Sequence, residues 1–233
     1  MAYFKDAWWN DLNELRARTD KVYEKVGRNI WQLTAEKMIE LRGWKAKEAK
    51  LIPILEELGI YYIPKKLVPG PMFVFPEYDA AGKLTRAQTK PLHDLFGAGK
   101  YHTLGVKKEQ FLGPVWLGNS TPALQKVLDT KSVLLVEGPF DLVATRMATE
   151  MPVMSSLTKS IGEKHEIYLK LLGVTQLYLM MDSDEAGEKS SAYLAQTLTI
   201  PTMSLVCPDE DPSESFKTVG RRDALIRYLK GME

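Results

Sequence analysis

The chain of 233 residues contains one cysteine, Cys207, carries a net charge of only +1, and has no long uninterrupted apolar run. A single cysteine excludes an intrachain disulfide and any zinc finger or ribbon built on two or more cysteines. Because the net charge is near zero, any contact with nucleic acid must come from a local basic surface. The N-terminus, MAYFKDAWWNDLNELR, lacks the basic-then-apolar order of a signal peptide. We therefore expect a cytoplasmic protein with no membrane partner.

What the sequence does contain is a hydrophobic pattern that changes along its length. Apolar residues recur at helical spacing up to Gly59, and Pro53 is expected to kink the last of these helices or to lie in its first turn. Prolines, alternating apolar residues and the turn DAAGK then predict a β-hairpin over 72–78 and 83–90. A short strand at GPVWLG and a helix over about 122–128 are expected next.

Strands and helices alternate from Ser132 onward. SVLLVEG, PVMSS, TQLYLMMD and TMSLV are continuous apolar runs, as expected for a parallel sheet covered on both faces. Helices are predicted between and after them, over 140–150, 162–172, 185–198 and from about 221. The fold class is therefore α/β, with an N-terminal helical segment (1–59), a smaller mixed α+β subdomain (60–130), an open, mostly parallel sheet (131–220) and a C-terminal helix (221–233).

Acidic residues follow three of these strands. Glu137 ends SVLLVEG, Asp182 and Asp184 end TQLYLMMDSD, and Asp211 lies in CPDEDPSE. Functional groups of open α/β sheets gather beyond the carboxyl ends of the strands. Two like charges about 4 Å apart repel by roughly 4 kcal/mol at an effective dielectric near 20, and a divalent cation turns that repulsion into attraction. We therefore expect a Mg²⁺ or Mn²⁺ site here.

The alternative for the same acids is structural. Asp184 would cap the helix that begins at Glu185, Glu137 would pair with a lysine, and residues 209–211 would form a solvated loop.

The motifs VEGPFD, SSLTKSIGEKH, MMDSDEAGEKS and DEDPSE resemble, in order and spacing, the Toprim domain of bacterial and phage DNA primases. The resemblance covers about residues 130–220 and looks strongest to the primase half of phage primase-helicases. It implies a Toprim-type sheet in which Glu137, Asp182 and Asp184 form a catalytic, metal-dependent centre, with Asp211 as a further ligand. Ser213 stands where bacterial primases often have a second aspartate, which weakens the expectation of a fully occupied second metal site.

Basic residues supply candidate contacts to nucleotide and template. FVFPEYDAAGKLTRAQTKPL is similar to a strand-turn-strand segment of the primase amino-terminal subdomain, in which a basic strand faces the Toprim acids. Arg86 and Lys90 share one side of this strand. Lys100 lies in the loop LFGAGKYHTLG, and Lys159 follows the second strand of the parallel sheet. The alternative for Arg86 and Lys90 is a solvated hairpin face.

The resemblance implies a primase polymerase core, an enzyme that makes short RNA primers on single-stranded DNA from ribonucleoside triphosphates in a bacterial or phage-infected cell. Two alternatives stay open: a non-catalytic Toprim module for DNA binding or helicase association, and a Toprim metal-dependent nuclease. Because the chain cannot build the multi-cysteine zinc module of related primases, we expect initiation to need a replicative helicase, a zinc-bearing partner or a flanking domain.

Overall fold

The computed structural model describes residues 12–25, 27, 29–64, 71–78, 84–92, 102–105, 116–118, 120–157 and 161–232. Three helices come first: α1 (Leu12–Lys25), α2 (Ile30–Arg42) and α3 (Glu48–Leu58). Gly43 and Gly59 end α2 and α3 in the left-handed conformation, with φ of 66° and 67°. The helix end expected at Gly59 is confirmed. Pro53 lies inside α3 and not in its first turn.

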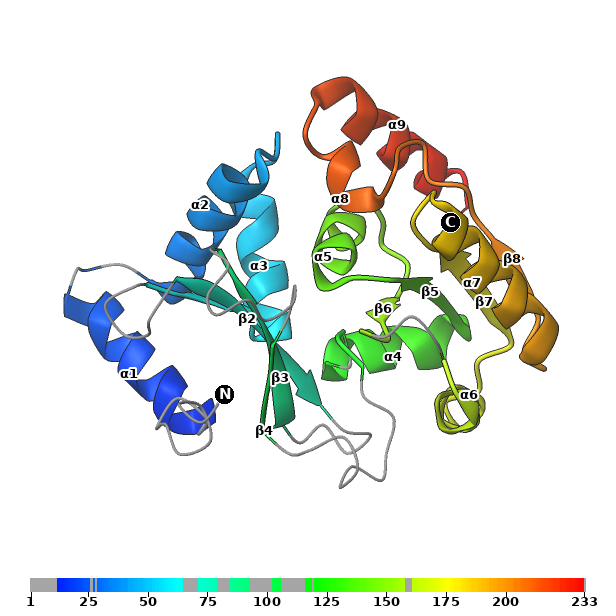
Figure 1. The fold of residues 1–233 in the computed structure, drawn as a ribbon, viewed down its shortest axis with the longest axis horizontal. Coiled ribbons are helices and arrows are strands. Elements are labelled where there is room, and N and C mark those ends of the chain that lie inside the picture. The colour runs from blue at the N-terminus through cyan, green and yellow to red at the C-terminus, as the bar shows by residue number, and fades with distance from the viewer. Residues whose placement is uncertain are drawn as a thin grey trace.

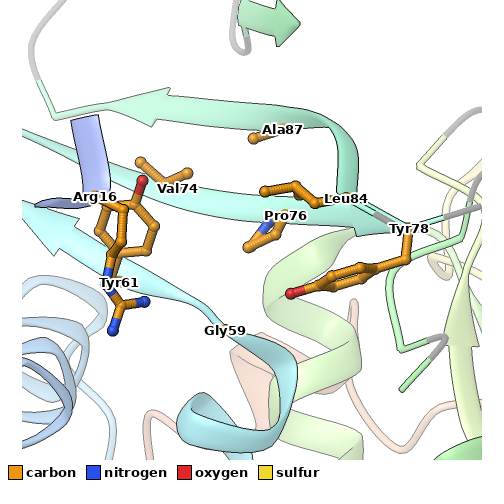
Figure 2. Close-up of a pocket in the computed structure, with 8 residues that line it drawn as sticks. All are labelled: Arg16, Gly59, Tyr61, Val74, Pro76, Tyr78, Leu84 and Ala87. Atoms are coloured by element: carbon orange, nitrogen blue, oxygen red, sulfur yellow. The ribbon is translucent and has the colours of Figure 1, made fainter. Parts of the chain in front are cut away.

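An antiparallel sheet follows, made of β1 (Tyr61–Ile63), β2 (Met72–Tyr78), β3 (Leu84–Pro91) and β4 (His102–Gly105) in the order β1-β2-β3-β4. The predicted hairpin is confirmed as β2 and β3. One face of the sheet packs towards α1 and contains a cavity of about 100 Å³, into which Val74 and Ala87 point (Figure 2). Because strand side chains alternate, Phe75, Glu77 and Arg86 belong to the opposite face.

A parallel sheet forms the second half of the described chain, in the order β6-β5-β7-β8 (Figure 1). The open, mostly parallel sheet predicted from the apolar runs is thus confirmed. Helices connect and flank these strands, and the elements in chain order are α4 (Thr121–Thr130), β5 (Ser132–Val136), α5 (Pro139–Ala148), β6 (Val153–Ser155), α6 (Glu163–Leu171), β7 (Gln176–Met180), α7 (Glu185–Thr197), β8 (Thr202–Ser204), α8 (Pro212–Ser215) and α9 (Val219–Lys230).

The segment 116–118 ties the two sheets together. Trp116 bridges to Tyr78 at the end of β2, and the next residue, Leu117, bridges to Ser155 at the end of β6. These described residues form two single bridges in place of the short strand predicted at GPVWLG. A Cβ atom on Gly118, whose φ is 94°, would lie 2.6 Å from the carbonyl oxygen of Val153. Only glycine therefore permits this close approach.

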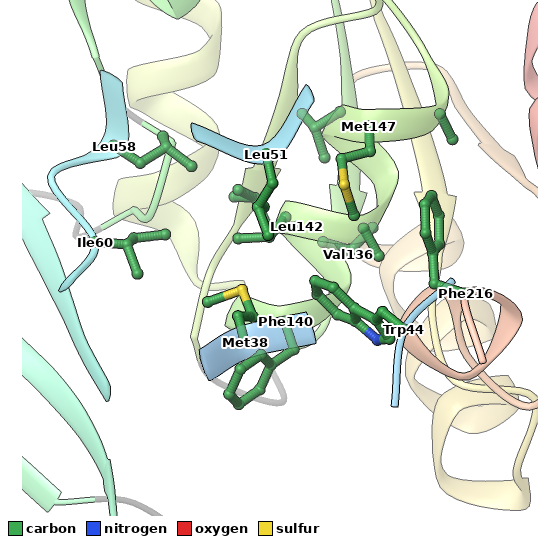
Figure 3. Packing of buried hydrophobic residues seen from close by; sticks show 14 of the residues in the cluster. Met38, Trp44, Leu51, Leu58, Ile60, Val136, Phe140, Leu142, Met147 and Phe216 are labelled. Atoms are coloured by element: carbon green, nitrogen blue, oxygen red, sulfur yellow. The ribbon is translucent and has the colours of Figure 1, made fainter. Parts of the chain in front are cut away.

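One hydrophobic cluster spans both halves of the chain. Figure 3 shows Met38 of α2 and Trp44 of the connection to α3 packed with Val136, Phe140 and Phe216 from the parallel-sheet half. The ring of Phe140 meets Phe75 edge-on, with centroids 5.1 Å apart, and α3 packs against α5. The start of α5, directly after β5, is thereby fixed against the antiparallel sheet. Within the described ranges, no helix combines the length and apolar character that crossing a membrane requires.

Candidate active site

The acids predicted as a site follow strands that are neighbours in the sheet. Val136 of β5 is paired with Met180 of β7, so Glu137 and Asp182 leave the same edge from adjacent strands. On the other side of β7, the backbone N–H of Ser183 donates to the carbonyl oxygen of Glu210 at 2.7 Å. The loops after β7 and β8 are thus joined, and they bring Asp211 to the same edge. The three strands that precede these acids thus lie side by side, in the order β5-β7-β8.

The start of α7 explains the glycine in the motif DSDEAG. The carboxylate of Asp184 accepts a hydrogen bond of 2.7 Å from the backbone N–H of Gly187 and so caps the helix. A Cβ atom on Gly187 would lie 2.0 Å from the carbonyl oxygen of Asp182. Because the helix presses directly on this backbone, Asp182 is held at the edge of the sheet. Capping, the structural alternative for Asp184, is confirmed, and its exposed carboxylate still faces solvent.

Asp141 is a member of the acidic cluster that sequence reasoning did not select. Its side chain is buried, accepts hydrogen bonds from the backbone N–H groups of Gly138 at 3.1 Å and Ser213 at 3.3 Å, and lies close to Asp182 and Asp211. Burial and then these two neighbouring carboxylates raise the pKa of Asp141 to about 8. The motif EGPFD could have indicated this residue, because its spacing places Asp141 in the first turn of α5, four residues after Glu137.

The donor chemistry of this cluster fits Mg²⁺ or Mn²⁺. Asp141, Asp182 and Asp211 are close enough for their charges to oppose one another's ionisation, and a cation would relieve that repulsion. As the described side chains stand, no three His, Cys, Asp or Glu residues are arranged to hold one metal ion. One oxygen of Asp211 instead accepts a 2.6 Å hydrogen bond from the N–H of Glu214, at the start of α8. Coordination would therefore require some of these side chains to rotate.

Comparison with known proteins identifies the sheet that carries these acids. Residues 131–206 match the family model described as the Toprim domain. The parallel sheet therefore matches the Toprim domain. A DNA primase of Chlamydia pneumoniae is 27% identical over 161 residues, which are 60% of this chain and 27% of that relative. The chain thus spans about a quarter of the length of that primase.

Solved primase structures share the fold of most of this chain. The RNA polymerase domain of Mycobacterium tuberculosis primase DnaG is similar with a TM-score of 0.67 and 18% identity, covering 92% of this chain and 81% of that one. The primase fragment of the bacteriophage T7 primase-helicase gives a TM-score of 0.58 and 21% identity, covering 80% and 74%. The chain therefore has the fold of primase catalytic domains, including the part before the Toprim domain.

Arg42, at the end of α2, contacts Ser213 of α8, beside the acidic cluster. Its Nη2 donates a hydrogen bond of 2.6 Å to Oγ of Ser213, and its guanidinium lies 4.8 Å from the ring centroid of Phe140. Ser213 in turn donates its backbone N–H to Asp141. An arginine–serine contact thus occupies the position where the resemblance implies a second acid. No pattern in the sequence indicates this contact, because its two residues lie 171 positions apart.

Arg86 is buried, and does not lie on a solvated face of the hairpin. Its side chain is 7% exposed and pairs with the fully buried Glu77, with 2.5 Å between Nε and Oε2. Burial raises the pKa of Glu77, and Arg86 opposes that rise. The solvated-face alternative is therefore wrong for Arg86, because the pair is directly cross-strand on the inner face of the antiparallel sheet. Whether Arg86 contacts nucleotide or template stays a prediction.

The same face of β3 turns towards the Toprim domain. Nε2 of Gln88 donates a hydrogen bond of 3.3 Å to the carbonyl oxygen of Leu157, in the loop after β6. Lys90 shares this face by strand alternation and is half-buried. Lys100 and Lys159, the other predicted binding residues, lie outside the described residues.

Proposed function

We propose that the chain is the polymerase core of a DNA primase, which joins ribonucleoside triphosphates into short RNA primers on single-stranded DNA. The observation that carries this proposal is the gathering of Asp141, Asp182 and Asp211 at the carboxyl edge of a Toprim sheet. A second sheet, with Gln88 and Lys90 on its facing side, stands beside the loop after β6 of that domain. We propose that residues 131–220 supply the catalytic acids and that residues 60–130 face the template.

In this proposal Glu137, Asp182, Asp184 and Asp211 hold Mg²⁺ or Mn²⁺, which would neutralise the triphosphate and lower the pKa of the primer hydroxyl. Glu137 is half-exposed and would accept a substrate proton, while its backbone carbonyl accepts a 2.8 Å hydrogen bond from Oγ of Ser155. Asp141 holds the N–H groups of Gly138 and Ser213 and so positions the loops that carry the other acids.

We further propose that Lys90, Lys100 and Lys159 bind the triphosphate or the template backbone, with Arg86 fixing the strand that presents Lys90. The catalytic domain of a DnaG primase has been solved with single-stranded DNA, which supports this choice of template. The T7 fragment belongs to a primase-helicase, and a replicative helicase or zinc-bearing protein is the partner we propose for initiation. Such an enzyme would work in the cytoplasm of a bacterial or infected cell.

The alternatives predict different products from the same substrates. The chain would be incubated with end-labelled single-stranded DNA, labelled ribonucleotides and Mg²⁺ or Mn²⁺, alongside Asp182→Asn and, as a matched control on an exposed carboxylate, Asp129→Asn. A primase yields RNA products that require metal and Asp182 but not Asp129. Shortening of the labelled DNA would establish a nuclease, and binding without either product would establish a non-catalytic module.

A further inference from the structure

A cavity of about 280 Å³ lies away from the acidic cluster, where the N-terminal helices meet the end of the chain. Its apolar lining comes from four separate segments: the residues before α3, the end of α5, the residue after α8, and α9. They contribute Ala46, Met147, Phe216 and Ile226, respectively. Figure 3 shows Met147 and Phe216 at one end of the packed core, so this hollow opens onto the hydrophobic core itself.

The rim of this cavity is positively charged. Lys47 and Lys50, near the start of α3, are exposed and form no ion pair with the described residues. Arg222 is compensated, because its Nη2 lies 2.8 Å from Oδ1 of Asp223, the one acid in the lining. Lys47 and Lys50 therefore contribute two positive charges beside the apolar lining that no described carboxylate pairs with.

The walls are held in place by hydrogen bonds between distant segments. The backbone N–H of Lys45 donates to the carbonyl oxygen of Phe216 at 2.6 Å, and Nη1 of Arg222 donates to the carbonyl oxygen of Lys45. The segment before α3 is thus joined to α8 and α9 on both sides of the hollow. A cavity held in this way loses little conformational freedom when it is filled.

We propose that this cavity docks an acidic segment of a partner protein, which inserts one bulky apolar side chain between α3 and α9 and places its carboxylates against Lys47 and Lys50. The volume is slightly below the usual 300–1,000 Å³ of small-molecule pockets and suits one aromatic side chain. The side chains of Ala46, Met147, Phe216 and Ile226 offer hydrocarbon and sulfur, which suit an apolar side chain better than the polar edge of a nucleic-acid base. An apolar anchor surrounded by complementary charge is a common basis of peptide affinity.

The test uses a fluorescein-labelled synthetic peptide in which one phenylalanine is flanked by aspartates and glutamates. Its binding to the full chain is followed by fluorescence anisotropy, next to a peptide with alanine in place of phenylalanine. Two variants alter the site: Lys47→Glu with Lys50→Glu reverses the rim, and Ala46→Trp fills the hollow. The matched control, Lys21→Glu with Lys25→Glu, makes the same charge change on exposed positions of α1. Thermal unfolding checks that every variant is folded.

The expected result is saturable binding that weakens roughly tenfold or more for the alanine peptide, for the reversed rim and for Ala46→Trp, and stays within about twofold for the α1 control. The reversed rim keeps the test valid if Ala46→Trp does not fold, because its two lysines are exposed. Equal binding of the two peptides, an equal loss in the α1 control, or no saturable binding would overturn the proposal. The proposal would also be overturned if the peptide did not bind and a labelled single-stranded oligonucleotide bound instead, with its binding lost in the variant with Lys47→Glu and Lys50→Glu.

Discussion

Replacing Asp141 by asparagine should stabilise the metal-free protein at neutral pH and destabilise it in acid. With its pKa raised from 3.8 to about 8, this carboxyl stays mostly protonated in the folded protein at pH 7 but is ionised in the unfolded chain. The folded state therefore binds more protons between about pH 4 and pH 8, and the free energy of unfolding falls as the pH rises through that window. Below about pH 4 the carboxyl is protonated in the unfolded chain as well, so folding no longer has to add a proton to it.

The size of the effect follows from the same pKa values. One pKa unit corresponds to about 1.4 kcal/mol, so the cost of keeping Asp141 protonated at pH 7 is at most about 4 kcal/mol. Asparagine is neutral in both states and avoids this cost. It keeps one oxygen and so loses one of the hydrogen bonds from Gly138 and Ser213, at about 1–3 kcal/mol. The variant should gain about 1–3 kcal/mol at pH 7 and lose about 1–3 kcal/mol near pH 4.

Urea unfolding in the presence of EDTA, repeated from pH 4 to pH 8.5, measures this crossing. Asp129→Asn is the matched control and should run parallel to the wild type, because Asp129 is exposed on α4. Added Mg²⁺ should stabilise the wild type more than Asp141→Asn, since the cation relieves the repulsion among the acids. Stability curves of wild type and Asp141→Asn that stay parallel at every pH would refute the assignment of Asp141 to the acidic cluster.

Three further changes test other parts of the site. Asp182→Asn or Asp184→Asn should abolish metal-dependent activity. Neither change should lower metal-free stability, because removing one charge relieves repulsion and asparagine at position 184 can still cap α7. Wild-type activity in both variants would show that these two acids do not hold the metal. Gly187→Ala should destabilise by about 1–3 kcal/mol and weaken Mg²⁺ binding in calorimetry, because its Cβ would collide with the Asp182 backbone. Gly220→Ala is the matched control, because a Cβ atom there meets open space, and it should change neither stability nor Mg²⁺ binding. Arg86→Ala should cost about 3–5 kcal/mol in urea unfolding by stranding the buried Glu77, and a neutral result would mean that the pair is not buried in solution.

The apolar runs predicted the strand types and helix ends well because hydrophobic periodicity reports directly on burial. The α/β pattern alone did not establish which strands are neighbours, and the order β6-β5-β7-β8 shows that Glu137, Asp182 and Asp211 follow adjacent strands. Asp141 was not predicted as a member of the acidic cluster, because an acid in the first turn of a helix is also typical of a residue that caps that helix. Arg42 could not be predicted, since its contact with Ser213 depends on how the two halves pack.

The burial of Arg86 also could not be predicted from the sequence. Its strand position and direction were predictable, yet the sequence does not reveal that Glu77 lies directly opposite on a face covered by α5. A charged residue on a hairpin is normally solvated, whereas here Phe140 of α5 packs against Phe75 on the same face and the Glu77–Arg86 pair is buried.

Template-directed addition of a ribonucleotide to an annealed RNA primer is the measurement that bears most directly on the proposed function. With Mg²⁺ or Mn²⁺, the wild-type chain should add the nucleotide complementary to the template, and Asp182→Asn should add none. Initiation on unprimed single-stranded DNA should be far weaker and show little sequence preference, because the chain lacks the cysteines of a zinc module. Failure of the folded wild-type protein to extend the annealed primer would contradict a polymerase core and favour the non-catalytic alternative.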